Sequence, residues 1–231
     1  MITYQKALKT FEGETMEVTP TGKKRICIPV MTNFVGAEPL KYRDWSGAEQ
    51  DGIGFKFKCN DADTSEQFVS ANEGIILCAE KQLPDGKMLS TTIQEYLDKH
   101  PSALRTVEGM TKFIEYMKPL ALNVEGKTDI YTSGYDFLAD SISGGPTKND
   151  IKVGKVYVGP KKADTLQAYR VAAGVEFEGA PGTTSSQVAG KDGAYILKDK
   201  DGVRMIQAAV FNESYSITKK PKSPTIENVN E

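Results

Sequence analysis

Over residues 1–80, apolar and polar positions alternate over short distances, and Gly, Pro, Asn and Asp separate the runs. A period of two is typical of β-strands that bury one face. The clearest example is the Phe-Lys-Phe-Lys-Cys run at residues 55–59, whose lysines lie on the opposite face from its aromatic rings. Residues 26–31 and 74–80 are continuous apolar runs, which predict more fully buried strands.

Between residues 89 and 122 the pattern changes to the period of an amphipathic helix. We expect Thr91 to be the N-cap of a first helix, because a glutamine follows three residues later. A second helix is expected to begin after Ser102 or Thr106 and to end before Pro119. Its stripe of methionine and aromatic residues fits a core face, with the docking of a partner helix as the alternative.

Residues 151–218 return to strand-like alternation and form a predicted C-terminal β module, with a hairpin turn at residues 199–202. Small and polar residues at 141–150 indicate a linker between this module and an N-terminal α+β module, residues 1–140. Residues 219–231 are expected to form an extended tail. The predicted fold class is α+β, rich in mostly antiparallel strands, with a central pair of helices.

Composition places the chain among globular proteins, since 39% of its 231 residues are hydrophobic and 26% are charged. The formal net charge of -2 provides no overall basic field that would attract nucleic acid or anionic lipid. Residues 219–222 contain three lysines, which favours a short solvated tail, with a nucleic-acid or partner contact as the alternative; elsewhere we expect no nucleic-acid contact. Neither a signal-like N-terminus nor a run of 18 apolar residues is found, so we expect no membrane association and a cytosolic location.

Candidate catalytic and metal-binding chemistry is sparse. The three cysteines lie far apart with no C-x-x-C pair, and Cys27 and Cys78 fall in apolar runs, so we expect buried thiols, no metal site and no cofactor. His100 is the single histidine, and its place at the predicted end of a helix favours an interaction with the helix dipole. One functional hypothesis is an enzyme that uses Asp136 and Asp140 as paired carboxylates.

Three runs near the C-terminus follow one another in a distinctive order. They are DGAYILK at residues 192–198, Asp-Gly at 201–202 and AVFNESY at 209–215. This order resembles the ending of small tailed-bacteriophage proteins with a PGDYG-like motif. The resemblance implies a phage protein located in the host cytoplasm or in the virion, and it implies no activity. A weaker echo of the same order begins at residues 73–77, which is consistent with a duplicated β module.

These observations favour a non-enzymatic bacteriophage protein that binds other phage proteins or further copies of itself, as a virion component or an accessory factor in the infected host. The alternative is a phage factor that binds and sequesters a small signalling molecule or nucleotide of the host. In that case Arg170, Arg204 and residues 161–162 are the candidate anion contacts, and Tyr195 and Trp45 are the candidate stacking surfaces. Trp45 has a second interpretation, as a lid over a small core.

Overall fold

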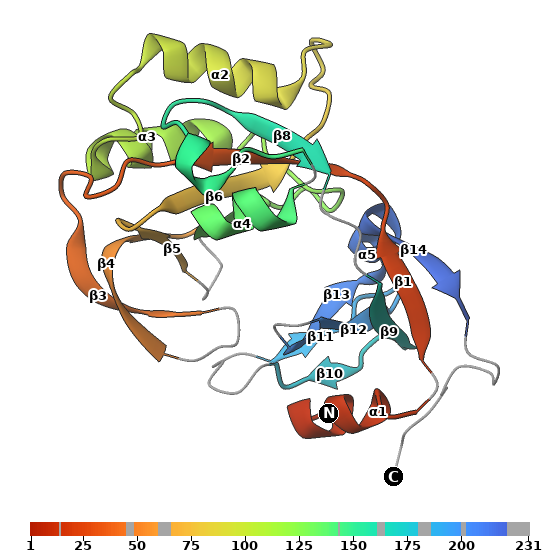
Figure 1. Ribbon diagram of the computed structural model, residues 1–231. Coiled ribbons are helices and arrows are strands. Elements are labelled where there is room, and N and C mark those ends of the chain that lie inside the picture. The colour runs from red at the N-terminus through yellow and green to blue at the C-terminus, as the bar shows by residue number, and fades with distance from the viewer. Residues whose placement is uncertain are drawn as a thin grey trace. The chain divides into compact units, whose positions relative to one another are not determined.

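The computed structural model describes residues 1–13, 15–44, 49–59, 66–142, 144–160, 165–179, 186–199 and 202–220. In these residues the chain forms five α-helices and fourteen strands in antiparallel sheets, 23% helical and 41% strand (Figure 1). The predicted β-rich α+β class is therefore confirmed. The chain divides into two compact units. Unit 1 comprises Met1–Thr21, Arg43–Gln50 and Ala163–Glu231, and unit 2 comprises Gly22–Tyr42 and Asp51–Lys162.

Unit 1 is built on a five-stranded antiparallel sheet with the order β13-β12-β9-β1-β14 (Figure 1). Its strands are β1 (Met16–Pro20), β9 (Leu166–Val171), β12 (Ala194–Asp199), β13 (Gly202–Gln207) and β14 (Tyr215–Lys219). The remaining elements of the unit are the helices α1 (Tyr4–Thr10) and α5 (Ala208–Ser214) and the two-stranded pair β10 (Glu176–Phe177) and β11 (Gln187–Val188).

Strand β12, which lies between β13 and β9, sends alternate side chains into two separate cores. Ala194 and Ile196 pack in the core that contains residues of α1, whereas Tyr195 and Leu197 pack in the core that contains Phe211 of α5. The rings of Tyr195 and Phe211 stack with their centroids 3.7 Å apart and an interplanar angle of 11°. One helix therefore packs on each face of the sheet, which gives unit 1 three layers.

Unit 2 has the same kind of layering around a four-stranded antiparallel sheet with the order β7-β6-β2-β8. Its strands are β2 (Lys24–Pro29), β6 (Gly74–Ala79), β7 (Ile130–Gly134) and β8 (Tyr157–Pro160). On β6, Ile76 and Cys78 pack against α2 (Leu89–Lys99) and α3 (Val107–Met117), whereas Ile75 and Leu77 pack against α4 (Tyr135–Ser141). The predicted pair of central helices is confirmed. The buried strand predicted over residues 74–80 is present as β6, in which residues 74–78 are buried and Ala79 is partly buried.

A second, three-stranded sheet with the order β3-β4-β5 lies mostly in unit 2. Its strands are β3 (Glu38–Arg43), β4 (Glu49–Phe57) and β5 (Gln67–Ser70), and a short 3-10 helix, η1 (Lys148–Asp150), follows α4. Phe55 and Val69 of this sheet are buried in the core shared with α2 and α3. The second sheet therefore shares the main core of unit 2.

The two units repeat one substructure. In unit 1, β9, β12 and β13 are neighbours and β13 runs directly into α5; in unit 2, β2, β6 and β7 are neighbours and β7 runs directly into α4. In both units, the first residue of the helix donates its backbone N–H to the residue that precedes the middle strand of the repeated three, β12 or β6. The bonds are from Ala208 to Gly193 O at 3.2 Å and from Tyr135 to Glu73 O at 2.8 Å. Both acceptor residues have left-handed φ angles, 77° and 58°. Such a repeat is expected of a duplicated module.

The N-terminus belongs to a different unit from the one expected. The sequence pattern predicts a module of residues 1–140 that includes residues 1–21. In the structure, β1 pairs with β9 and β14, which places residues 1–21 in unit 1. Residues 4–10 also form a helix and not a strand, because Thr3 Oγ1 accepts the backbone N–H of Lys6 and caps the first turn.

The predicted linker at residues 141–150 lies inside unit 2. Ile142 is only 2% exposed and packs with α4 against the main sheet, and η1 occupies the end of the segment. Small polar residues suit a packed turn as well as a linker, so composition alone could not separate the two. Lys219 lies in β14 and Lys220 is described, whereas the rest of the predicted tail lies outside the described residues.

The second of the two central helices begins as predicted and the first does not. Thr106 Oγ1 accepts the backbone N–H of Gly109 at 2.9 Å and caps α3. The prediction for Thr91 is wrong, because α2 begins at Leu89 and its N-cap is Met88, three residues before Thr91. The backbone N–H of Ser90 donates instead to Glu80 Oε1 at 3.2 Å, so a carboxylate from the preceding segment satisfies the first turn of α2.

The stacked rings in unit 1 allow a direct test of this core. Replacing Phe211, which is 1% exposed, with alanine removes a buried ring and leaves a cavity beside Tyr195. We expect Phe211→Ala to lower the free energy of unfolding by about 3–5 kcal/mol in urea titrations followed by circular dichroism. The control Val188→Ala, at a residue that is 55% exposed, should change it by less than about 0.5 kcal/mol. Equal effects of the two substitutions would contradict the assigned core.

Two buried thiols make stability depend on alkaline pH. Burial raises the pKa of Cys27 from 9.0 to about 12, partly offset by Arg25, and burial is also the main cause that raises the pKa of Cys78. The folded state therefore favours the protonated thiols, whereas the unfolded chain ionises them near pH 9. The contribution of the buried thiols to the free energy of unfolding is therefore complete below pH 9 and is lost as the pH rises towards 12.

We expect the free energy of unfolding, measured by urea titration, to fall between pH 8.5 and pH 10. Linkage limits the slope to about 1.4 kcal/mol per pH unit for each thiol. The double variant Cys27→Ala/Cys78→Ala should show a smaller fall over the same interval, because it has lost both groups. An unchanged pH dependence in the double variant would refute the assignment to these thiols.

Candidate functional site

Three of the four predicted ligand-binding residues lie on neighbouring strands of the unit 1 sheet. Arg170 on β9 is directly opposite Tyr195 on β12, and Arg204 on β13 is opposite Leu197. Residues two positions away on each strand belong to the core that contains Phe211 of α5. Because side chains alternate along a strand, all three predicted residues are on the α5 face of the sheet.

Their individual contacts differ from the predicted roles of stacking surface and anion contacts. Tyr195 is 8% exposed and stacks on Phe211, so its ring contributes to the core. Arg204 Nη2 lies 3.4 Å from the hydroxyl of Tyr215, whose ring stacks in turn on Phe211. Arg170 is exposed, and its Nη2 donates to Asp192 O at 3.3 Å. The fold thus brings the three residues to one face but uses the aromatic one for packing.

The other candidate ligand contacts lie outside the described residues. Trp45 falls between β3 and β4 in the sequence, and residues 161–162 follow β8.

Strand β14 forms one edge of the unit 1 sheet. The backbone N–H of Thr21 donates to Ser214 O at 3.0 Å, so these two residues form a hydrogen-bonded pair. Bonded and non-bonded pairs alternate along an antiparallel ladder, so Ser216 bonds to β1 while the backbone N–H and C=O groups of Tyr215 and Ile217 point away from it. On that outer side, no strand of the described residues pairs with β14.

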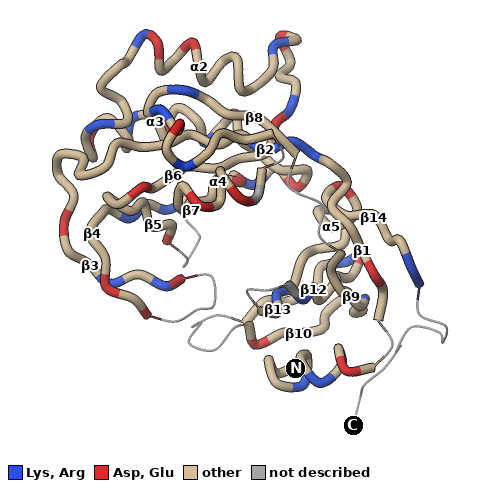
Figure 2. Tube along the Cα trace, in the orientation of Figure 1, with Lys and Arg blue, Asp and Glu red and all other residues tan. Residues whose placement is uncertain are grey.

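Side chains fix β14 to its inner neighbour. Lys219 Nζ lies 3.0 Å from Glu17 Oε1, and Thr218 Oγ1 donates to Glu17 O at 3.1 Å. Four of the five residues of β14 are exposed, and the one charge of the strand is at its C-terminal end (Figure 2). Ile217 is 38% exposed, which leaves an apolar side chain beside an open row of backbone groups.

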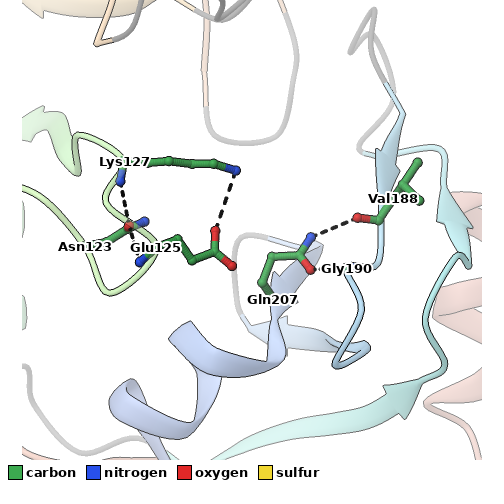
Figure 3. Close-up of polar contacts among 6 residues, drawn as sticks. All are labelled: Asn123, Glu125, Lys127, Val188, Gly190 and Gln207. Atoms are coloured by element: carbon green, nitrogen blue, oxygen red, sulfur yellow. Dashed lines mark hydrogen bonds and ion pairs between the residues drawn. The ribbon is translucent and has the colours of Figure 1, made fainter.

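The opposite edge strand, β13, ends in a side-chain contact. The carboxamide of Gln207 donates from Nε2 to Val188 O at 2.9 Å and accepts from the backbone N–H of Gly190 at 2.8 Å (Figure 3). One side chain therefore fastens β11 and the segment after it to the end of β13.

Unit 2 contains a cavity of about 340 Å³ on the second sheet, which we call the β4 pocket. It is lined by Asn33, Tyr42, Asp51, Gly52, Ile53, Phe68, Ser70, Ala71 and Asn72. The rings of Tyr42 on β3 and Phe68 on β5 stack with centroids 4.0 Å apart and an interplanar angle of 15°. A Cβ at Gly52 would lie 2.9 Å from an atom of each ring, so the stack depends on glycine at this position.

Backbone hydrogen bonds hold the rim of the β4 pocket. The N–H of Asn33 donates to Ala71 O at 2.8 Å, and the N–H of Ala71 donates to Ile53 O at 2.7 Å. The turn that carries Ala71 continues to Glu73, whose Oε2 is 2.6 Å from Lys148 Nζ. Hydrogen bonding to Glu73 is the largest cause of the raised pKa of Lys148. The pocket residues are thus supplied by three segments joined through backbone contacts.

The sequence contains an indication of this pocket that the alternation of apolar and polar residues does not reveal. Gly52 and Gly54 stand two positions apart inside a strand, and glycine within a strand marks a close approach of other groups. The aromatic partners come from two other strands, so their positions could not be inferred from β4 alone.

The candidate catalytic groups have other contacts. Asp136 lies 3.3 Å from Lys148 Nζ, and the ring of His100 is 4.4 Å from that of Tyr96. Within the described ranges, no group of three or more His, Cys, Asp and Glu side chains is placed to hold a metal ion. Among the helices in the described part of the chain, none has both the length and the apolar character needed to cross a membrane.

Comparisons with known proteins add no relationship to this geometry. No protein-family model, no curated protein and no solved structure matches the chain.

Proposed function

We propose that the chain is a non-enzymatic bacteriophage protein that acts by binding protein, and that its primary contact is with a second copy of itself through β14. It would serve as a virion component or as an accessory factor in the cytoplasm of the infected host. The observation that carries the proposal is the open outer edge of β14. There the backbone N–H and C=O of Ile217 and the C=O of Tyr215 have no partner among the described strands, while the N–H of Tyr215 donates to Phe211 O at the end of α5.

Edge strands readily accept another strand, because each added backbone hydrogen bond satisfies a donor and an acceptor. Natural sheets that must avoid such pairing protect their edges with charges, prolines or bulges that face the open side. The first four residues of β14, Tyr-Ser-Ile-Thr, contain neither a charge nor a proline. The irregularity at Glu17 and Val18 lies on the inner side, in the pairing with β1. This edge is therefore suited to sheet extension.

The sequence of β14 is complementary to itself in the antiparallel direction. A two-fold axis at Ile217 would place Ile217 opposite its own copy, Ser216 opposite Thr218, and Tyr215 opposite Lys219. The two copies of Lys219 would then lie at opposite ends of the paired strands, which avoids the repulsion of like charges directly across a ladder. A second copy of the chain is thus the partner that fits this edge.

The phage part of the proposal rests on the sequence resemblance described above. The runs at residues 192–198 and 209–215 form most of β12 and α5, together with the first residue of β14. Phe211 of α5 and Tyr215 of β14 are in contact through their rings, so the residues that carry the resemblance also support the open edge.

Substitution at Ile217 tests the proposed interface. Ile217→Pro removes a backbone donor that points away from β1, so it should abolish dimers while leaving the β1–β14 ladder in place. We expect the unmodified protein to give twice the chain mass of 25.3 kDa in native mass spectrometry and light scattering, and Ile217→Pro to give the single mass.

The matched control is Ile217→Val, which keeps the donor and a branched apolar side chain and should remain dimeric. Circular dichroism and urea titration of Ile217→Pro establish that a monomer is folded. A dimeric Ile217→Pro protein would place the interface elsewhere, and an unmodified protein that stays monomeric as its concentration rises would refute self-association.

A further inference from the structure

We propose that the β4 pocket of unit 2 binds a neutral sugar ring. Its volume of about 340 Å³ lies at the lower end of the range of small-ligand pockets, which suits one ring and its hydroxyl groups. The assignment follows from the combination of an aromatic surface, free amide and carboxylate groups, and the charge of the lining. It concerns a different unit from β14 and does not depend on self-association.

The aromatic part of the pocket is preorganised. Tyr42 and Phe68 are stacked on each other over Gly52, and both side chains are half-buried, so parts of both rings line the cavity. Each ring covers one face of the other, so only the outer faces and the edges are available to a ligand. An outer aromatic face carries partial negative charge and attracts the weakly positive C–H groups that line one side of a sugar ring. No ordering of flexible side chains is needed to form this surface, which reduces the entropic cost of binding.

The polar part of the pocket supplies both donors and acceptors. In the described part of the chain, the side-chain amides of Asn33 and Asn72 and the carboxylate of Asp51 have no hydrogen-bond or ion-pair partner. Ser70 Oγ is already bonded, since it donates to Asn72 O and accepts from the N–H of Asn72. Each amide offers an N–H₂ donor and a carbonyl acceptor, and the carboxylate accepts only. Hydroxyl groups, which donate and accept, can satisfy all three side chains.

The charge of the lining separates this ligand class from the alternatives. Among the described residues, the lining of the pocket contains one carboxylate, Asp51, and no lysine or arginine. A phosphate or other anion would be repelled by that carboxylate and would find no cation to pair with among these lining residues. An ammonium ligand would pair with Asp51 and donate to the amide carbonyls, but it has no acceptor for the amide N–H₂ groups of Asn33 and Asn72. A neutral polyhydroxyl ring avoids both mismatches.

The test is a titration of the full chain with defined sugars, followed by saturation-transfer NMR. The neutral probes are glucose, galactose, mannose and N-acetylglucosamine, and the charged probes are glucosamine and glucose 6-phosphate. We expect at least one neutral sugar to bind with transfer from aromatic protons, and to bind more tightly than both charged probes. Tyr42→Ala and Asn72→Ala should each raise its Kd at least tenfold.

Asn72→Ala and the control Glu38→Gln separate a loss of binding from a loss of folding. Asn72→Ala changes an exposed turn residue and leaves the aromatic stack intact, so it reports on the site even where Tyr42→Ala disturbs the sheet. Glu38→Gln removes an exposed carboxylate from β3 outside the pocket and should leave the Kd unchanged, whereas Asp51→Asn should raise it.

Three outcomes would overturn the assignment. The first is that no neutral sugar binds. The second is that glucosamine or glucose 6-phosphate binds more tightly than the neutral sugars. The third is that the Kd of Asn72→Ala equals that of the unmodified chain. Each result is independent of the mass of the assembly, so a failure here and a failure of the β14 interface are distinguishable.

Discussion

Each unit depends on one inner strand of its main sheet that is buried on both faces. In β6 and in β12, consecutive side chains pack in different cores, so neither strand has a face for solvent. A strand of this kind requires an apolar layer on both sides, and short helices supply one of these layers in each unit, α4 in unit 2 and α5 in unit 1. The direct passage from β7 into α4 and from β13 into α5 keeps each helix beside its sheet. The layered architecture thus follows from two short apolar runs, residues 74–79 in β6 and residues 194–197 in β12.

Those runs are also the part of the fold that sequence predicts best. Residues 74–79 are continuously apolar apart from the first glycine, and they form β6 as expected. The pairing of β1 with β9 and β14 joins segments some 150 to 200 residues apart, and local periodicity carries no information about such contacts. The start of α2 was wrong for the same reason, since Glu80, and not a residue of the local capping pattern, accepts the N–H of Ser90.

The candidate sites were harder to predict than the fold, because each depends on several strands. Arg170, Tyr195 and Arg204 do come together on one face, as period-two alternation of three paired strands requires. Alternation could not show that Phe211 would cover the ring of Tyr195. The β4 pocket was missed because its aromatic rings stand on β3 and β5, while the signal in the sequence was the absence of side chains at Gly52 and Gly54.

Both proposed binding features lie where the units depart from their common substructure. In unit 2, β8 follows α4 and pairs directly with β2, the neighbour of the central strand. In unit 1, β1 lies between β9 and β14, so the strand that follows α5 is displaced by one position to the edge of a wider sheet. The second sheet, which forms the β4 pocket, has no counterpart among the described strands of unit 1. The repeated strands and helices must fill two cores at once, which limits the residues they can accept, whereas added strands with an exposed side can change without loss of the core. New binding surfaces are therefore expected on the additions.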